Sequence, residues 1–116
     1  MSTPADFIPA RVIVQDLMRG RGALAESGDD IVVHYVGTIL GGPQFDSSRN
    51  RRDPLDFALG AGDVIKGLDE GVAGMRVGGL RKITIPAELA YGDQGCGGII
   101  PPGATLVFDV ELLEVK

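Results

Sequence analysis

The clearest pattern in the chain is the run Thr105-Leu106-Val107-Phe108-Asp109-Val110-Glu111-Leu112-Leu113-Glu114-Val115. Large apolar side chains recur at every second position from Leu106 to Leu112, and Asp109 and Glu111 stand between them. Successive side chains of a β-strand point to opposite faces of its sheet, so this alternation predicts one buried and one wet face. We therefore expect the run to be a strand of an antiparallel sheet.

A glycine-rich loop directly precedes this strand and reads Tyr91-Gly92-Asp93-Gln94-Gly95-Cys96-Gly97-Gly98-Ile99-Ile100-Pro101-Pro102. Glycine loses more backbone entropy on folding than any other residue, so such a loop is costly unless it has a function. Ile99 and Ile100 are apolar residues that a solvated loop tip does not need, and we expect them to cover an apolar surface. The loop therefore predicts one wall of a pocket, with Tyr91 at its root.

The rest of the chain adds further strands and one helix. Period-two or β-branched runs predict strands at residues 11–17, 30–38, 55–59 and 80–85. Helical spacing is confined to the segment that holds Val64, Ile65, Leu68, Val72 and Met75, with Asp63 as a plausible N-cap. Three glycines in this segment, at 67, 71 and 74, would each cost a helix about 1 kcal/mol, so tertiary packing must hold it. The expected architecture is α+β, with several antiparallel strands wrapped over one short helix.

Composition limits the classes of function. The 116 residues are enough for one domain, which we place at residues 11–116 behind a flexible leader at residues 1–10. The formal charge of −5 argues against a nucleic-acid partner, and no apolar run approaches the length of a membrane span. The single cysteine excludes an internal disulfide, and the first residues lack the features of a signal peptide. We expect a cytoplasmic protein.

Several kinds of active site lack their usual parts. With one histidine and one cysteine, the chain cannot by itself build a Cys/His zinc cluster, and we expect no metal. A nucleophilic pair of Cys96 and His34 would require a loop residue to reach a strand residue whose neighbours face the other way. Ser47 and Ser48 have no second histidine to serve them. The glycine-rich segments match no phosphate-binding or dinucleotide motif, so we expect no cofactor.

What remains is an apolar pocket with a carboxylate beside it. Five of the aromatic residues lie on or near predicted strands, and aliphatic residues around 64–68 and 99–100 could complete a wall, although ordinary core is the simpler interpretation of any one of them alone. Asp46 follows Phe45 directly. A buried carboxylate needs partners, and Arg51 and the Tyr35 hydroxyl are the natural ones, unless Asp46 only forms a turn. Apart from this role for Arg51, the basic cluster of Arg49, Arg51 and Arg52 is typical of a solvated loop face.

Six short motifs, taken in order, resemble the FKBP-type peptidyl-prolyl cis-trans isomerases, the macrolide-binding prolyl isomerase family. The resemblance runs from about Arg11 to Lys116 and implies a single domain with about five antiparallel strands curled around one short α-helix. The motifs are Val32-Val33-His34-Tyr35, Phe45-Asp46-Ser47-Ser48-Arg49, Val64-Ile65-Lys66-Gly67, Ala90-Tyr91-Gly92, Gly98-Ile99-Ile100-Pro101-Pro102 and Ala104-Thr105-Leu106-Val107-Phe108-Asp109-Val110-Glu111-Leu112.

The same resemblance implies the residues of a proline-binding site. Catalysis would fall to three residues: the Ile65 amide and the Tyr91 hydroxyl would bind carbonyl oxygens of the ligand, and Asp46 would lie near the twisting carbonyl. The residues implied in substrate binding are Tyr35, Phe45, Arg51, Leu55, Phe57, Val64, Leu68, Ile99, Ile100 and Phe108.

Three positions depart from the best-known eukaryotic pattern of the family. Leu68 stands where the floor of the pocket is usually tryptophan, Leu55 where phenylalanine is common, and Cys96 where a loop histidine is often found. The change at Leu68 keeps the floor apolar but removes a large flat surface. It bears more on macrolide affinity than on activity.

The implied function is peptidyl-prolyl isomerisation by a cytoplasmic monomer. Its substrates would be X-Pro bonds in peptides and unfolded proteins, with macrolides of the tacrolimus and rapamycin type as further ligands. Rotation about a peptide bond makes and breaks no σ-bond, so the lack of nucleophiles and metals agrees with this chemistry. Two alternatives stay open: a proline-motif or macrolide binding module without catalysis, and a folding chaperone, which the lack of any added client-holding segment weakens.

Overall fold

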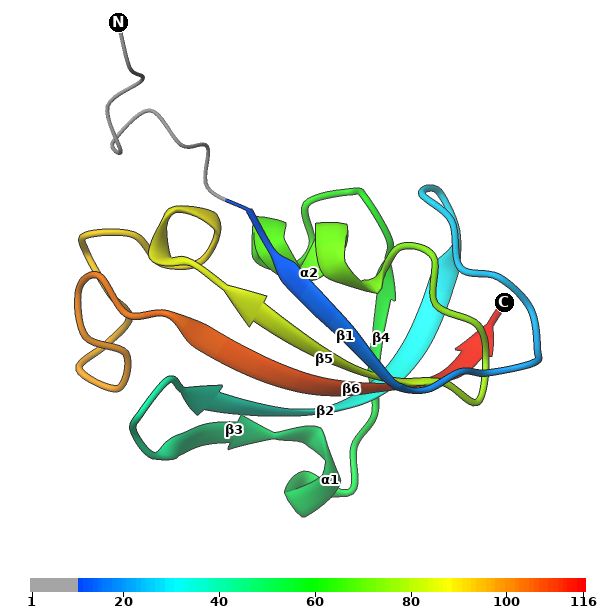
Figure 1. Cartoon of the computed structure of the whole chain (residues 1–116), viewed down its shortest axis with the longest axis horizontal. Coiled ribbons are helices and arrows are strands. Elements are labelled where there is room, and N and C mark those ends of the chain that lie inside the picture. The colour runs from blue at the N-terminus through cyan, green and yellow to red at the C-terminus, as the bar shows by residue number, and fades with distance from the viewer. Residues whose placement is uncertain (1–10) are drawn as a thin grey trace, which may run out of the picture.

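The computed structural model describes residues 11–116, and the predicted leader at residues 1–10 lies outside the described residues. A six-stranded antiparallel sheet runs in the order β1-β5-β6-β2-β3, and β4 also pairs with β2 (Figure 1). The α+β architecture is as predicted. The elements are β1 Ile13–Met18, β2 Asp30–Ile39, β3 Gln44–Ser47, α1 Ser48–Arg51, β4 Leu55–Ala58, α2 Lys66–Val72, β5 Leu80–Ile85, the 3₁₀ turn η2 Ala87–Leu89 and β6 Leu106–Val115.

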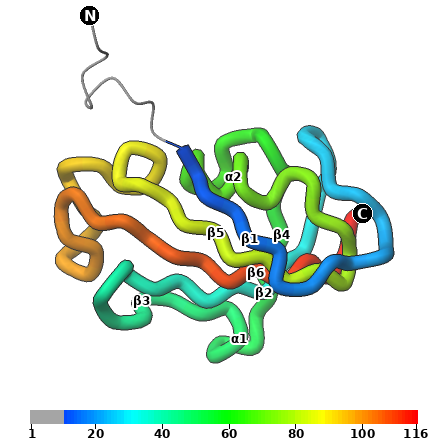
Figure 2. Tube along the Cα trace, in the orientation of Figure 1, coloured from blue at the N-terminus to red at the C-terminus, as the bar shows by residue number. Residues whose placement is uncertain are grey.

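Strand β2 organises the sheet because both of its edges are used. One edge pairs with β6 along nearly its whole length. The other edge pairs with β3 over residues 36–38 and with β4 over residues 30–33. β3 and β4 therefore act as two halves of one strand, and α1 with residues 52–54 forms an excursion between the halves. Figure 2 shows the turn between β2 and β3 at the same end of the sheet as the long 86–105 connection.

The core lies between α2 and the sheet face that the alternating patterns predicted. Ile31, Val33 and Tyr35 of β2 are buried, as are the apolar residues that alternate along β6. The glycines of α2 explain how the helix fits. A Cβ atom at Gly67 would lie 2.3 Å from Ile85 Cγ2. The helix backbone thus packs directly on β5, and this packing offsets the low helix propensity of glycine.

The helix is shorter than its apolar spacing suggested, and the predicted N-cap is wrong. The N-cap residue is Ile65, whose backbone is extended (φ −57°, ψ 148°), and the helix begins at Lys66. The Asp63 carboxylate instead accepts a hydrogen bond from the Ala58 amide at 3.1 Å. Val64, Ile65 and Met75 are therefore apolar residues of flanking chain. Within residues 11–116 no helix is both long and apolar enough to cross a membrane.

We expect Gly71→Ala to destabilise the fold although alanine is the better helix former. The added Cβ would lie 2.5 Å from Ile83 Cγ2 and 3.0 Å from its Cδ1. Such overpacking costs about 1–3 kcal/mol, which exceeds the gain of about 1 kcal/mol in helix propensity. Urea unfolding measures the difference, with Lys66→Ala, at an exposed position of the same helix, as the control. A Gly71→Ala variant at least as stable as the unsubstituted chain would contradict the close approach.

Candidate functional site

A β-bulge in β3 brings two neighbouring side chains to the same site. Gly37 of β2 pairs with Asp46, and the next residue of β2, Thr38, pairs with Gln44. Phe45 is therefore the extra residue of the strand. Neighbours on a regular strand face opposite sides of the sheet, and a bulge removes this restriction. The sequence pattern Phe45-Asp46 can thus supply both an apolar ring and a carboxylate to one site.

The Asp46 carboxylate is held by three groups. The Tyr35 hydroxyl donates a hydrogen bond of 2.6 Å to its Oδ2 atom, and the Ser47 amide donates one of 2.8 Å to Oδ1. The Arg51 guanidinium forms an ion pair with Oδ1. Arg51 also donates to the Tyr35 hydroxyl at 3.0 Å and lies 5.8 Å from the centre of the Tyr35 ring. The predicted partners of Asp46 are therefore confirmed, and its alternative as a simple turn residue is excluded.

These contacts set the charge state of the site. Burial alone would raise the pKa of Asp46, but the hydrogen bonds from Tyr35 and Arg51 and the charge of Arg51 outweigh it, and its pKa lies below the ordinary 3.8. Burial, helped by the hydrogen bond to Asp46, raises the pKa of Tyr35. Asp46 is accordingly a fixed negative charge at neutral pH and a poor proton acceptor.

Helix α1 is anchored under Tyr35 by a residue that sequence reasoning did not assign to the site. The Ser48 hydroxyl is fully buried and accepts a hydrogen bond of 2.7 Å from the Tyr35 amide. Ser47 caps the helix, since its side chain accepts from the Asn50 amide at 3.1 Å. Because Arg51 lies on this short helix, the two serines fix its distance from Asp46. The only sequence signal was the pair of serines after Asp46.

The packing of the aromatic rings at the site depends on Gly37, a second residue that the sequence analysis did not assign to the site. Phe45 and Phe108 meet edge to face, with ring centres 5.7 Å apart, and Phe108 lies 5.9 Å from the Tyr35 ring. A Cβ atom at Gly37 would lie 2.6 Å from the Phe45 ring and 3.0 Å from the Phe108 ring. Gly37 therefore leaves the space that these rings occupy. Its signal was a glycine inside a strand pattern, which often marks a close approach.

The segment before α2 offers a backbone donor. Within residues 11–116, the Ile65 amide has no protein acceptor, while the Ile65 carbonyl accepts from the first turn of α2. Leu68 on α2 and Phe57 on β4 are buried nearby in the core, and Val64, Ile65 and Leu55 pack against it. An amide that points to no protein acceptor beside apolar side chains can bind a carbonyl oxygen of a ligand.

The 86–105 connection separates the two isoleucines that the sequence analysis treated as a pair. Ile100 is buried in the core, whereas Ile99 is 64% exposed. The cause is a small hairpin in which the amides of Ile99 and Ile100 both donate to the Cys96 carbonyl, and the Cys96 amide donates to the Ile100 carbonyl at 2.8 Å. Ile99 therefore does not pack on the core as Ile100 does, and its predicted contact with a ligand stays a prediction.

Tyr91 lies at the root of this hairpin with its hydroxyl available. It is 37% exposed, and its hydroxyl has no hydrogen-bond partner within residues 11–116. Burial raises the pKa of Tyr91, and the negative charge of Asp46 raises it further. Its hydroxyl is therefore a protonated donor at neutral pH and lies within electrostatic reach of Asp46.

The structure brings most of the predicted site residues together in one main group. Of the other two, Tyr91 lies beside this group and Ile99 lies outside it. The functional roles of all these residues stay predictions. The main group, which packs in or on the core or is hydrogen-bonded to Tyr35, consists of Tyr35, Phe45, Asp46, Arg51, Leu55, Phe57, Val64, Ile65, Leu68, Ile100 and Phe108.

No accessible nucleophile with a base beside it is found among residues 11–116. The His34 Nδ1 atom lies 2.9 Å from the Ser48 hydroxyl, but Ser48 is fully buried and cannot meet a substrate. Cys96 is exposed in its loop, and His34 is engaged with Ser48 instead. Among these residues no three His, Cys, Asp or Glu side chains are arranged to hold a metal ion.

Comparison with known proteins decides the family. Residues 22–113 match the family model of the FKBP-type peptidyl-prolyl cis-trans isomerases. The chain belongs to this family. An FK506-binding protein of Neisseria meningitidis serogroup A is 56% identical over 104 residues, which cover 90% of this chain and 95% of that protein. The yeast peptidyl-prolyl cis-trans isomerase FPR2 is 58% identical over 93 residues, which cover 79% of this chain and 69% of that protein.

Two solved structures share the fold of this chain. The crystal structure of AtFKBP13 superposes with a TM-score of 0.83 at 43% identity, covering 90% of this chain and 93% of that one. FkpA from Escherichia coli gives a TM-score of 0.82 at 47% identity, covering 90% of this chain but 48% of that one. Nearly the whole of this FKBP-type chain is therefore matched in both structures.

We expect Tyr35→Phe to raise the pKa of Asp46 in this isomerase toward 3.8, because the substitution removes a hydrogen bond that lowers it. The carboxyl ¹³C shift of Asp46, followed by NMR against pH, measures the change. A depressed folded-state pKa stabilises the fold above about pH 3.8, and that contribution is lost as the pH falls through the folded value. The stability advantage of the unsubstituted chain over Tyr35→Phe should therefore shrink in acid.

The matched control is Tyr91→Phe, the same chemical change at a tyrosine that is not hydrogen-bonded to Asp46. Equal Asp46 titration curves for the two variants would show that the hydrogen bond from Tyr35 does not set the charge state of the site.

Proposed function

We propose that this FKBP-type isomerase accelerates rotation about X-Pro bonds in peptides and unfolded proteins, using the site around Tyr35, Asp46 and Tyr91. One observation carries the proposal. Two hydrogen-bond donors that have no protein partner among residues 11–116, the Ile65 amide and the Tyr91 hydroxyl, flank an apolar cluster and an ionised carboxylate. These groups together can hold an amide and change its electrostatic environment.

The chemistry requires little more. Rotation about a peptide C–N bond faces a barrier of about 18–20 kcal/mol because planar resonance must be broken. An enzyme that binds the twisted amide more tightly than the planar one by about 7 kcal/mol accelerates the rotation about 10⁵-fold. The planar amide is the more polar state. An apolar surface from Phe57, Leu68 and Phe108 favours the twisted state over it, and fixed dipoles contribute in the same direction.

Each polar group then has a role that its own contacts support. The Ile65 amide and the Tyr91 hydroxyl would bind carbonyl oxygens of the substrate and hold its backbone in place. Asp46 would supply a fixed negative field near the carbonyl that twists away from its usual plane. Its three hydrogen-bonding contacts and depressed pKa suit a field better than a proton transfer.

A protease-coupled assay on a short X-Pro peptide tests the proposal. We expect a clear acceleration by the unsubstituted chain, and losses of about tenfold for both Tyr91→Phe and Asp46→Ala, because each removes a polar contact worth roughly 1–2 kcal/mol. Asp93→Ala, the same change at an exposed position of the neighbouring loop, serves as the control and should keep full activity. Circular dichroism confirms that each variant is folded. No acceleration by the unsubstituted chain would overturn the proposal.

We also propose that the same site binds macrolides. FK506-binding proteins from three Neisseria meningitidis strains match this chain at 55–56% identity over nearly its full length. One experiment on macrolide binding distinguishes an enzyme from a binding module without catalysis. Macrolide titration into the peptide assay should abolish the acceleration. Saturable macrolide binding by a chain that never accelerates the peptide would favour the binding module.

We propose finally that the protein acts as a cytoplasmic monomer. Every residue of the proposed site comes from one chain, and the single cysteine forms no internal disulfide that would need an oxidising compartment. Sedimentation equilibrium should give the mass of one chain, 12.1 kDa. A dimer mass at micromolar concentration would contradict the monomer, and recovery of the native protein outside the cytoplasmic fraction would contradict its location.

A further inference from the structure

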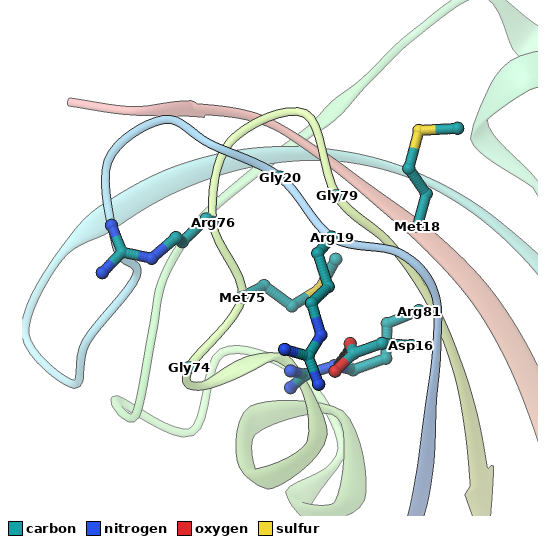
Figure 3. A pocket seen from close by; sticks show the side chains of 9 residues that line it. All are labelled: Asp16, Met18, Arg19, Gly20, Gly74, Met75, Arg76, Gly79 and Arg81. Carbon is teal, nitrogen blue, oxygen red and sulfur yellow. Dashed lines mark hydrogen bonds and ion pairs between the residues drawn. The ribbon is translucent and has the colours of Figure 1, made fainter.

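A hollow of about 300 Å³ lies away from the proline site, between the end of β1 and the turn that joins α2 to β5 (Figure 3). Residues 22–24 and 76–77 are hydrogen-bonded to each other beside it. Its lining contains none of the residues proposed for the isomerase reaction. The lining residues are Asp16, Met18, Arg19, Gly20, Gly74, Met75, Arg76, Gly79 and Arg81.

Arg81 is the fixed charge of this hollow. Only 11% of its side chain is exposed. Its Nε atom donates to Asp16 at 2.7 Å, and its Nη1 atom donates to the carbonyls of Gly71 and Ala73 at the end of α2. These contacts hold the guanidinium in one orientation, at the carbonyl end of the helix, where a cation is favourable.

One edge of this guanidinium stays open. Within residues 11–116 the two N–H groups of Nη2 have no protein acceptor. No buried side-chain nitrogen in that range lacks a partner, so Nη2 is in contact with solvent. A largely buried arginine whose Nε and Nη1 groups are already bonded is held in one orientation, and its remaining Nη2 N–H groups can donate a charged hydrogen bond to a carboxylate or phosphate oxygen.

Arg19 adds a second guanidinium at the same place. Figure 3 shows its side chain beside the Asp16 carboxylate and the Arg81 guanidinium. Arg19 has no side-chain hydrogen bond or ion pair within residues 11–116. Asp16 is the only carboxylate in the lining, and the guanidiniums of Arg19 and Arg81 lie beside it. The side chain of Arg76 points away from these groups and donates to the Gly22 carbonyl, so the local excess is one positive charge, in a chain whose formal charge is −5.

The rest of the lining is apolar or lacks side chains. Met75 is 3% exposed and forms part of the floor, and Met18 stands at the wall with an exposed side chain. Packing already explains one lining glycine, since a Cβ at Gly20 would lie 2.3 Å from the Arg76 carbonyl. This glycine is therefore no evidence for a ligand. The space above Met75 is larger than one oxyanion needs.

We propose that this hollow binds a small organic anion, with its carboxylate or phosphate head on Arg19 and Arg81 and its apolar part over Met75. The anion takes the open Nη2 donors of Arg81 without disturbing the contacts of that guanidinium to Asp16 and α2. Arg19 closes over the head group from the solvent side. This site is separate from the isomerase site and does not depend on its activity.

NMR titration of the ¹⁵N-labelled full chain tests the proposal with four probes: phenyl phosphate, benzoate, inorganic phosphate and uncharged phenol. The amides of Gly20, Gly74 and Gly79 should shift saturably with phenyl phosphate or benzoate, while the Ile65 amide of the proline site stays unchanged. The tighter of these two probes identifies the head group. Inorganic phosphate should bind more weakly than phenyl phosphate, and phenol should cause no comparable shifts.

Arg19→Gln should weaken the binding about tenfold, since one charged hydrogen-bond donor is lost. Arg52→Gln, an exposed position outside the hollow, makes the same change in net charge and should leave affinity unchanged. Arg19 is preferred to Arg81 because the latter also holds the end of α2. Shifts that do not saturate, equal losses in the two variants, or equal binding of phenol would overturn the proposal.

Discussion

The shared edge of β2 is the constraint on which the site depends. β3 and β4 pair with different halves of that edge, so the chain must leave the sheet between them and return to the same line. The excursion is α1, and Ser48 fastens it to the backbone of Tyr35. Asp46 thereby reaches Tyr35 from β3, and Arg51 reaches it from the excursion.

This arrangement explains why a carboxylate can stand beside an apolar cluster. An unpaired charge at the edge of an apolar cluster is unfavourable, but the contacts of Asp46 to Tyr35, Arg51 and the Ser47 amide compensate for its partial burial. The same contacts depress its pKa and keep it ionised. The site therefore combines a fixed negative charge, unused donors and an apolar surface, a combination suited to rotation about an amide and unsuited to covalent chemistry.

The sequence predicted those parts of the fold that follow from simple periodicity. The alternation along β2 and β6 identified the buried face, and the need of Asp46 for a partner pointed to Tyr35 and Arg51. What it missed depends on short-range geometry. The bulge at Phe45 and the four-residue α1 are too short for any periodicity, and Asp63 fits an N-cap on sequence alone. The separation of Ile99 from Ile100 follows from hairpin hydrogen bonds, which no residue pattern encodes.

The most direct test of the non-covalent account is the solvent isotope effect on kcat/KM for an X-Pro peptide, measured in H₂O and D₂O across a plateau of pH. A site that only holds and twists an amide transfers no proton in the rate-limiting step. The account predicts equal rates in the two solvents and a flat profile from mild acid to neutral pH, where Asp46 stays ionised. A clear slowing in D₂O, together with a titration in the neutral range, would contradict it.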